Sequence, residues 1–376
     1  MLFSSAIFLF AFLPVVVLVY YLLPKRCAAA RNIFLTAVSL LFYAWGEPRF
    51  VFVMLLVIVL SWFFARKIEM TAGTLKKTLL AVAVGADLTV LFIFKYIGFF
   101  TENLNHLPFV QLPVPQITLP IGISFFTFQA ISYVVDVYRG HVAQKSLWDV
   151  MLYIAFFPQL IAGPIVRYSD FADQIRNRQE SLQKLAKGGY RFALGLGKKV
   201  ILSNNLAYVA DAAFSSVGNL SLSMAWLGAI GYSLQLYFDF SGYSDMAIGL
   251  GQMFGFRFLE NFNYPFISRS ITELWRRWHI SLGSWFRDYV YIPLGGSRVK
   301  TKHRLYLNIF VVWLLTGAWH GAKWTYIAWG MMYFVLLCAE RILGWSGKKT
   351  WYSWLYTIYF FVAGNVVFRS EMLPAQ

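Results

Sequence analysis

Cysteine is scarce in this sequence: Cys27 and Cys338 are the two cysteines among 376 residues. They lie far apart and form no Cys-x-x-Cys pair, so a zinc ribbon, a thioredoxin-type redox site and a covalent haem attachment have no support. A secreted scaffold built on disulfides is excluded as well. Charged residues are also few, making up 13% of the chain against about 25% in a soluble domain.

Apolar and aromatic residues dominate instead. Hydrophobic residues make up 59% of the chain, with 36 Phe, 22 Tyr and 14 Trp, and the mean hydropathy is +0.58. A soluble globule of this size has too little interior to bury so much apolar surface, and exposing it leads to aggregation. The composition therefore excludes an ordinary soluble enzyme and a disordered chain, and it indicates a membrane protein.

The charge is one-sided. Lys and Arg number 33 against 17 Asp and Glu, which gives a net charge of +16. Most of these basic residues stand between apolar runs, as expected of loops on the cytoplasmic side of a membrane. Membrane lipid is therefore an expected partner, and nucleic acid is not.

The apolar runs are long and continuous, whereas the strands of a membrane barrel alternate in polarity. They predict an all-α polytopic membrane protein with roughly ten apolar segments, including re-entrant or interfacial helices. Lys25 and Arg26 follow the first run, which puts that end in the cytoplasm and the N-terminus outside. No internal repeat or second soluble domain is apparent, so residues 1–376 are expected to form one membrane-embedded domain. The runs lie at 2–23, 32–45, 50–65, 79–100, 119–137, 198–214, 224–251, 305–319, 324–343 and 351–368.

The segment 147–166 is apolar but has basic residues on both flanks. A full crossing would place one of these flanks outside. Pro158 and the pair Gly163-Pro164 also interrupt any helix here. We therefore interpret the segment as a re-entrant or interfacial hairpin, which is tolerated at membrane depth where protein or a water-filled cavity covers it.

The stretch 257–304 is polar and aromatic, without a clean span. Ser270 and Glu273 have the spacing of a capping box. The helix that follows places Glu273 beside Arg276 and Arg277, and tryptophans recur along one face at helical spacing. We expect a short amphipathic helix at the cytoplasmic boundary. Two interpretations stay open: an interfacial anchor, or a basic pocket for a phosphate-bearing cosubstrate such as coenzyme A.

Two further places carry polar groups among apolar residues. Asp239 and Asp245 lie six residues apart on different faces of one predicted helix, so an acid–base dyad is not expected. Each is either satisfied by a structural Arg or a helix end, or lines a polar cavity. His320 stands between two apolar runs, next to Trp319 and flanked by glycines. A desolvated histidine stays neutral and can accept a proton, although a structural role is an equal alternative. No metal site is predicted, because no His-Glu-x-x-His pair is present.

Together these motifs resemble the membrane-bound O-acyltransferase family, in particular the bacterial branch typified by the alginate O-acetyltransferase AlgI. The resemblance runs in order along nearly the whole chain. The matching stretches are Phe42-Tyr-Ala-Trp-Gly-Glu-Pro48, Leu119-Pro-Ile-Gly-Ile-Ser-Phe125, Phe157-Pro-Gln-Leu-Ile-Ala-Gly-Pro-Ile165, Tyr237-Phe-Asp-Phe-Ser-Gly-Tyr-Ser-Asp245, Trp275-Arg-Arg-Trp-His-Ile-Ser-Leu282 and Leu315-Thr-Gly-Ala-Trp-His-Gly321.

The resemblance implies a funnel of helices around a buried tunnel in a multi-pass protein of the bacterial cytoplasmic (inner) membrane. It implies acyl transfer with His320 and His279 as catalytic residues, acetyl-CoA as a cosubstrate and no bound cofactor. The acetyl group would reach hydroxyls of an extracytoplasmic glycan, with help from an SGNH-type acyltransferase partner. Candidate donor- and acceptor-binding residues are Arg276, Arg277, Trp278, Trp319, Asp239 and Asp245.

One departure concerns the C-terminus. The chain stops soon after Phe368-Arg369-Ser370, so we expect it to lack the C-terminal helices of longer relatives. Two other functions stay open from the residues alone: a transporter for a polyanionic or lipid-linked glycan, favoured by the polar groups within the apolar segments, and a noncatalytic scaffold of a machine that exports or modifies a cell-surface polysaccharide.

Overall fold

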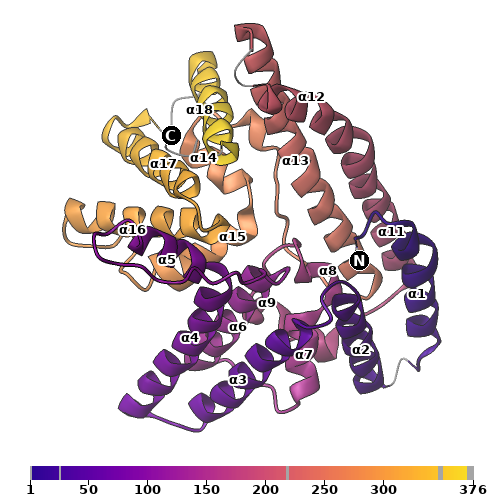
Figure 1. Cartoon of the computed structure of the whole chain (residues 1–376). Helices are drawn as coiled ribbons and strands as arrows, with labels where there is room; N and C mark the ends of the chain where they lie inside the picture. The colour runs from indigo at the N-terminus through magenta and orange to yellow at the C-terminus, as the bar shows by residue number, and fades with distance from the viewer. Residues whose placement is uncertain (1, 25–26, 217–219, 346–349, 371–376) are drawn as a thin grey trace. The chain divides into compact units, whose positions relative to one another are not determined.

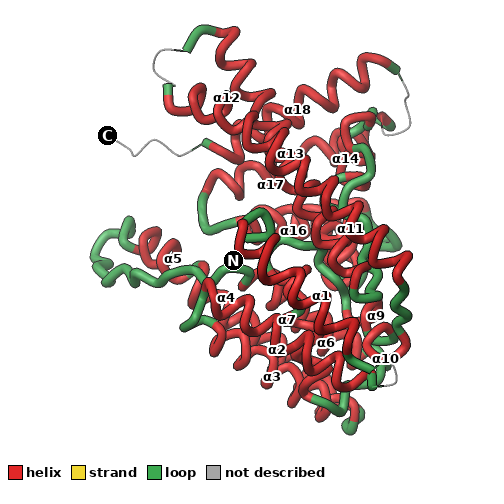
Figure 2. The backbone as a smooth tube through the Cα atoms, turned by 90° about the vertical axis from the view of Figure 1, so that its right-hand side faces the viewer, coloured by secondary structure: helices red, strands yellow, loops and turns green. Residues whose placement is uncertain are grey.

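The structure of the chain, a computed structural model, describes residues 2–24, 27–216, 220–345 and 350–370. These residues form helices and loops, with no β-strand among them (Figure 2). The prediction of an all-α protein is confirmed. Lys25 and Arg26, expected to mark a cytoplasmic end, lie outside the described residues. The chain divides into two compact units, residues 1–193 with 245–259 and residues 194–244 with 260–376.

The first unit contains the helices that precede residue 182, several of which are labelled in Figure 1. Three of them, α2, α3 and α4, are long and apolar enough to cross a membrane, and 8–22 and α6 are shorter apolar helices. More than one span makes the chain a polytopic membrane protein. The elements are η1 (Phe8–Phe12), α1 (Leu13–Leu22), α2 (Ala28–Gly46), α3 (Val51–Glu69), α4 (Gly73–Lys95), α5 (Ile97–Leu104), α6 (Ile123–Tyr138), α7 (Leu147–Ala155), α8 (Phe157–Leu160), α9 (Tyr168–Phe171) and α10 (Gln174–Asn177).

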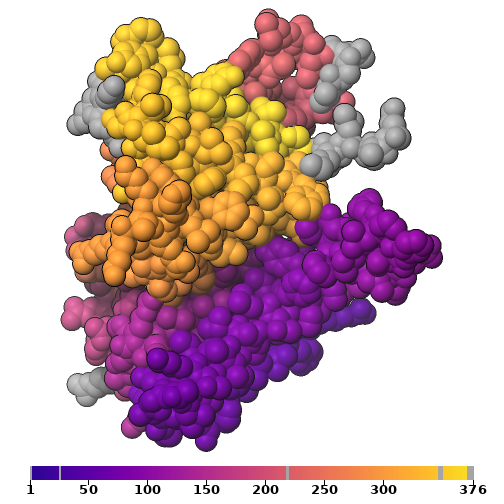
Figure 3. All heavy atoms as spheres, turned by 90° about the vertical axis from the view of Figure 1, so that its left-hand side faces the viewer, coloured from indigo at the N-terminus to yellow at the C-terminus, as the bar shows by residue number. Residues whose placement is uncertain are grey.

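Helix α6 forms the centre of this unit, since it packs against α3, α4 and α7 and most of its side chains are buried. The spans around it keep apolar side chains on the outside. Only 17% of the α4 span is buried, and Phe63 of α3 and Phe92 of α4 remain exposed. The purple surface in Figure 3 belongs to this part of the chain. In a membrane, lipid covers such a surface.

The segment 147–166 is broken as predicted. Helix α7 ends at Ala155, and α8 begins at Phe157 with Pro158 in its first turn. After α8 the chain returns to the place where it entered, because the Tyr168 hydroxyl donates a hydrogen bond to the Val142 carbonyl at 2.5 Å. Both flanks of the segment therefore lie close together, as a re-entrant or interfacial hairpin requires, and its placement in the membrane stays a prediction.

Two helices, α11 (Leu182–Gly197) and α13 (Leu222–Met253), contribute residues to both units. Within the first unit they approach closely: a Cβ atom built at Gly249 would lie 2.6 Å from the Gly188 carbonyl oxygen. Glycine is therefore required at this close helix contact.

The second unit contains the remaining elements, among which α16 and α17 pack closely together and α17 also contacts α18. The stretch between α13 and α16 holds only short helices, in agreement with the absence of a clean span there. The elements are η2 (Lys198–Ser203), α12 (Asn204–Ser215), η4 (Pro265–Ile267), α14 (Ile271–Arg277), α15 (Ile280–Phe286), η5 (Arg287–Tyr291), α16 (Lys302–His320), α17 (Trp324–Ile342) and α18 (Trp351–Arg369).

Candidate active site

Helix α14 carries the first part of the candidate site, and two devices hold its N-terminus. The Ser270 hydroxyl accepts a hydrogen bond from the Glu273 amide at 3.0 Å, so the predicted cap is present. Glu340 of α17 accepts hydrogen bonds from the amides of Ile271 and Thr272, at 2.5 and 2.9 Å. A carboxylate at this position satisfies amides that the helix leaves without partners and is favoured by the helix dipole. The N-terminus of α14 is therefore held in place, and with it the arginines and the tryptophan that the helix carries.

The predicted amphipathic helix is not continuous, and in this respect the prediction was wrong. Helix α14 ends at Arg277 and α15 begins at Ile280. Between them His279 adopts a left-handed backbone conformation, with φ 47° and ψ 51°. The cause lies in a distant segment: the Ile280 amide donates to the Asn261 carbonyl at 3.0 Å, and Phe262 forms an isolated β-bridge with Trp278. This pairing replaces the hydrogen bonds that would have continued the helix.

Asn261 also fixes the turn through its side chain. Its Oδ1 accepts from the Ser281 amide at 3.2 Å and from the Ser281 hydroxyl at 2.9 Å, while its Nδ2 donates to Ser244 Oγ at 3.0 Å. All three residues are buried. Sequence reasoning missed Asn261, because a single asparagine in an irregular stretch carries no periodic signal.

His279 is buried within an aromatic cage. Its ring lies 4.6 Å from that of Phe240 and 5.8 Å from that of Trp319, measured between centroids. Its Nε2 is closed off from solvent and has no hydrogen-bond partner in the described part of the chain. Burial, together with the nearby His320, holds the pKa of His279 well below its usual range. The neutral imidazole is therefore the form present in the folded protein.

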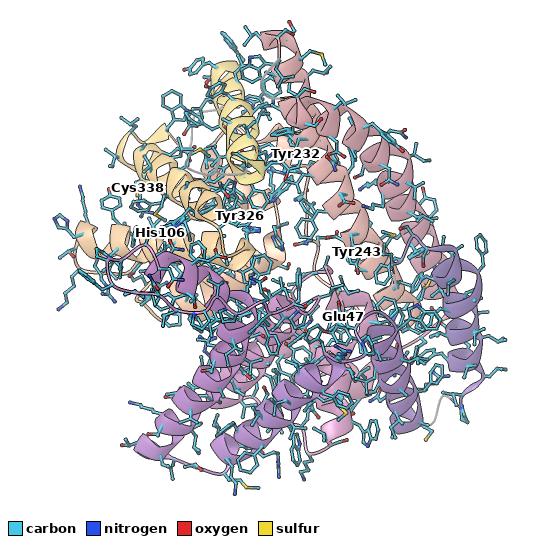
Figure 4. The ribbon with its side chains drawn as sticks, in the orientation of Figure 1. Glu47, His106, Tyr232, Tyr243, Tyr326 and Cys338 are labelled. Carbon is cyan, nitrogen blue, oxygen red and sulfur yellow. The ribbon has the colours of Figure 1, made fainter. Side chains whose placement is uncertain are left out.

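His320 is the last residue of α16 and, unlike His279, is partly accessible. The rings of Trp329 and Phe368 stand edge-on to it at 5.0 and 5.1 Å. Close packing of α16 on α17 brings Trp329 there: a Cβ atom at Gly317 would lie 2.5 Å from the Tyr326 carbonyl oxygen. Tyr326 is labelled in Figure 4. The glycine flank noticed in the sequence thus permits a helix contact that frames the histidine.

Both histidines line one cavity of about 560 Å³. Its wall is mostly aromatic and aliphatic, with Arg276 and Arg287 as its cations. Volume and lining are those of a site for a small organic group. The cavity is lined by Thr272, Trp275, Arg276, Trp278, His279, Ile280, Leu282, Gly283, Ser284, Phe286, Arg287, Val312, Trp313, Thr316, His320 and Leu337.

A second cavity of about 320 Å³ adjoins the first and shares seven of its lining residues, including Arg276, Arg287 and Trp313. It adds Arg341 and Tyr291. Three arginines therefore border its wall, and only Arg287 has an acidic neighbour at ion-pair distance in the described ranges, namely Asp288 at 2.7 Å. Such a wall suits an anion, because guanidinium groups bind phosphate in a bidentate manner.

Adjacent arginines of α14 have different surroundings. Arg276 borders both cavities and is exposed. Arg277 instead donates to Glu273 Oε1 at 3.0 Å and to the Asn263 carbonyl at 3.1 Å. Of the two candidates, only Arg276 is placed where it can contact a bound molecule in the described cavities. Its role stays a prediction.

The predicted tryptophans lie close to the histidines. Trp278 lines the larger cavity and packs its ring 4.9 Å from that of Phe361. Trp319 lies between the histidines, with its ring 5.8 Å from that of His279 and 5.1 Å from that of His320. Both tryptophans therefore shape the surroundings of the candidate catalytic residues.

The two aspartates of α13 are each paired with a cation. Asp239 forms an ion pair with Lys199, and Asp245 accepts from Arg191 at 2.9 Å. They belong to different units, and Asp239 is not among the residues that line the two cavities described here. The first of our two interpretations, a structural Arg, describes Asp245, whereas the partner of Asp239 is a lysine. Within the described residues no group of three potential metal ligands comes together.

Comparison with known proteins decides the family. A family model for membrane-bound O-acyltransferases matches residues 123–368, which include both histidines and both cavities. The chain belongs to the membrane-bound O-acyltransferase family. It is therefore a membrane O-acyltransferase, and the resemblance read from its motifs is confirmed.

Three relatives show how the family varies. A probable alginate O-acetylase, AlgI, of Pseudomonas putida is 46% identical, over 99% of this chain and 78% of the relative. A peptidoglycan O-acetyltransferase of Helicobacter pylori is 37% identical, over 100% and 78%. A teichoic acid D-alanyltransferase of Bacillus subtilis is 31% identical, over 72% and 70%. The names share acyl transfer and differ in the polymer and in the acyl group.

Sequence reasoning also missed Arg287, Arg341 and Glu340. Arg341 lies on α17, more than sixty positions from Arg276, and only the folded unit shows that they border one cavity. The signal available in the sequence was weak: a glutamate and an arginine at the end of an otherwise apolar helix.

Proposed function

We propose that this O-acyltransferase takes an acetyl group from cytoplasmic acetyl-CoA and delivers it toward hydroxyls of an extracytoplasmic polysaccharide, with His320 as the general base. One observation carries the proposal: the partly accessible His320 lines a cavity that is continuous, through shared residues, with a wall of three arginines. A thioester with a phosphate-bearing tail matches both halves of this site.

The arrangement divides the work between its two ends. Arg276, Arg287 and Arg341 bind the phosphates of coenzyme A, and the apolar cavity receives the acetyl thioester. His320 removes the proton of the acceptor hydroxyl as its oxygen attacks the thioester carbon. The resulting tetrahedral intermediate collapses, the carbon–sulfur bond breaks, and the departing thiolate of coenzyme A takes the proton from His320. His279 is closed off from solvent, so we assign it to positioning the aromatic wall.

The acceptor is proposed from the relatives. The printed names of two relatives are those of an alginate O-acetylase and a peptidoglycan O-acetyltransferase, and both polymers carry sugar hydroxyls. We propose a glycan acceptor outside the cytoplasm, reached with an SGNH-type acyltransferase partner, and a location in the bacterial inner membrane. Gene neighbourhood tests this part, since an adjacent SGNH-type gene supports it.

The test of the base replaces His320 with Ala in the full chain. We expect acetylation of the polysaccharide and release of coenzyme A by the purified protein to fall by at least about a hundredfold, as for loss of a general base. His303→Ala is the matched control, because His303 is exposed near the other end of the same helix. Unchanged acetylation at equal membrane levels of protein would refute the assignment, and normal function with both His279 and His320 replaced would favour a scaffold.

The adjacent arginines provide a second, internally controlled test. Arg276→Gln is expected to raise the KM for acetyl-CoA about tenfold with a smaller change in kcat, since a charge-assisted contact to phosphate is worth about 1.5–3 kcal/mol. Arg277→Gln alters the same helix and the same charge but removes a contact to Glu273, so its KM should stay near that of the parent. Equal effects of the two variants would argue against a phosphate site at Arg276.

A further inference from the structure

We propose that a cavity in the first unit binds the headgroup of a zwitterionic aminophospholipid. The cavity has a volume of about 350 Å³ and is built from the loop after α6 together with α9 and α10. It is separate from the candidate active site, and the inference does not rest on the proposed function. Its lining includes His141, Lys145, Asp173, Arg176 and Asn177.

The cavity lies at the depth of lipid headgroups. Helix α3, one of the three candidate spans, ends at Glu69, and Glu69 Oε1 accepts a hydrogen bond from the amide of Ala143 in the cavity wall at 2.9 Å. Lys76, in the first turns of the next span, stands 5.2 Å above the ring of Tyr138, the last residue of α6. The cavity wall is therefore hydrogen-bonded directly to the end of a candidate membrane span.

The wall is preformed. The Tyr168 hydroxyl accepts from Gln144 Nε2 at 3.0 Å while it donates to the Val142 carbonyl. The Gln144 amide in turn donates to the Tyr133 hydroxyl at 3.1 Å. These buried hydrogen bonds hold the loop after α6 against α9. A headgroup that enters need not order this wall, which lowers the entropic cost of binding.

Two charged groups of the lining have no ion-pair partner in the described ranges, and a third is paired only at the limit of ion-pair distance. Neighbouring charges are paired, as Arg167 with Asp170 at 2.7 Å. In contrast, neither Lys145 nor Asp173 forms an ion pair in the described ranges, and the Asp173 carboxylate does not cap α10. Arg176 reaches Asp149 only at 4.0 Å, with its side chain 66% exposed.

The cavity thus carries two cations and one carboxylate that do not pair with one another. This pattern matches a ligand that has both charges. Lys145 and Arg176 bind a phosphate diester, and Asp173 accepts hydrogen bonds from a primary ammonium, as in phosphoethanolamine. A purely anionic headgroup would leave Asp173 without a partner, and a choline headgroup has no N–H to donate.

Apolar side chains beside the cavity support a lipid over a soluble phosphate. Val142, in the wall, is 72% exposed, and Trp148, in the first turn of α7, is 46% exposed. Exposed tryptophan is typical of the membrane interface. These side chains are placed to contact the glycerol and upper acyl chains of a lipid whose headgroup occupies the cavity.

The experiment reconstitutes the full chain in phosphatidylcholine vesicles that contain a photoreactive analogue of phosphatidylethanolamine. We expect labelling of the peptides 141–145 and 172–177 in the parent, and about fivefold less in Lys145→Gln and in Arg176→Gln, the loss expected for one basic residue at a lipid surface. Lys77→Gln is the matched control: Lys77 is exposed at the same membrane end but does not line the cavity. Its labelling should equal that of the parent.

Competition separates the possible ligands. Unlabelled phosphatidylethanolamine should displace the analogue, while phosphatidylglycerol should compete poorly in the parent and as well as phosphatidylethanolamine in Asp173→Asn. The proposal is overturned if all variants label equally, if phosphatidylcholine or phosphatidylglycerol competes as well as phosphatidylethanolamine in the parent, or if inorganic phosphate abolishes labelling, which would identify a soluble anion as the ligand.

Discussion

His279 is held in a conformation that costs free energy. A left-handed backbone at a residue with a Cβ atom costs about 1–2 kcal/mol, and the closed-off Nε2 adds to this cost. Asn261 offsets it with three hydrogen bonds to Ile280 and Ser281, each contributing about 1 kcal/mol. The turn therefore persists because a buried asparagine on another segment stabilises it.

The lowered pKa of His279 has a consequence for acid stability. In the unfolded chain the imidazole titrates near 6.5, whereas the folded protein keeps it neutral to a lower pH. The unfolded state therefore gains a proton first as the pH falls. The stability linked to His279 is fully present above the unfolded pKa and is lost as the pH falls from there toward the folded pKa.

We therefore expect His279→Asn to flatten the acid branch of the stability curve, since asparagine tolerates the left-handed backbone and does not titrate. The measurement is the apparent unfolding temperature of the detergent-solubilised protein between about pH 7 and pH 5. His303→Asn, at an exposed position, should keep the slope of the parent. If His279→Asn also keeps the parent's slope, the buried neutral imidazole is not the cause of the loss of stability at acid pH.

At the scale of the element, the contact between α16 and α17 depends on two glycines. A Cβ atom at Gly330 would lie 2.5 Å from the Trp313 carbonyl oxygen, just as one at Gly317 would approach Tyr326. Both obstacles are backbone atoms, so no side chain can move aside. Because His320 ends α16 and Trp329 of α17 packs against it, a shift between these helices changes the surroundings of the candidate base.

Gly330→Ala is expected to destabilise the protein by about 2 kcal/mol, the range seen when a packed interior is overfilled, and to lower activity. Gly85→Ala in α4 is the matched control, because a Cβ atom there meets nothing within 4 Å. It should be neutral or stabilising by up to about 1 kcal/mol, since alanine favours the helix. Thermal unfolding of both variants decides; equal stability would contradict the tight contact.

Elements were predictable where one physical signal dominates. The spans α2, α3 and α4 were found because an apolar run long enough to cross the bilayer is a strong signal by itself. Helix α11 was missed, since its basic residues made it look like a loop flank. The break before His279 was missed because Asn261, eighteen positions earlier, causes it. A local pattern carries no information on such a pairing.

At the scale of the whole molecule, hydropathy predicts that a helix crosses the membrane, but not how much of its surface is buried by the rest of the protein. Helix α3 has the highest mean hydropathy of the three spans, 2.2, with 33% of the span buried, whereas α2 has the lowest, 1.3, with 39% buried. Lipid accepts apolar side chains as readily as a protein core does. The funnel around a tunnel and the single domain of residues 1–376 therefore stay predictions.

Orientation in the membrane follows from the distribution of charge in the first unit. Arg66 and Lys67 end α3, and Lys76 and Lys77 begin α4. The opposite ends of these spans lead to residues 47–50 and to the loop after α5, in which His106 is labelled in Figure 4. The excess of basic residues predicts that the first end faces the cytoplasm.

Cysteine labelling tests this orientation. With Cys27 and Cys338 replaced by serine, Lys77→Cys and His106→Cys each carry a single thiol, and both positions are exposed. We expect a membrane-impermeant maleimide to label His106→Cys in intact spheroplasts and Lys77→Cys only in inverted vesicles. A permeant maleimide should label both and serves as the control for thiol reactivity. The reverse pattern would contradict the assignment and would move the lipid-binding cavity, which lies beside Lys76 and Glu69, to the outer leaflet.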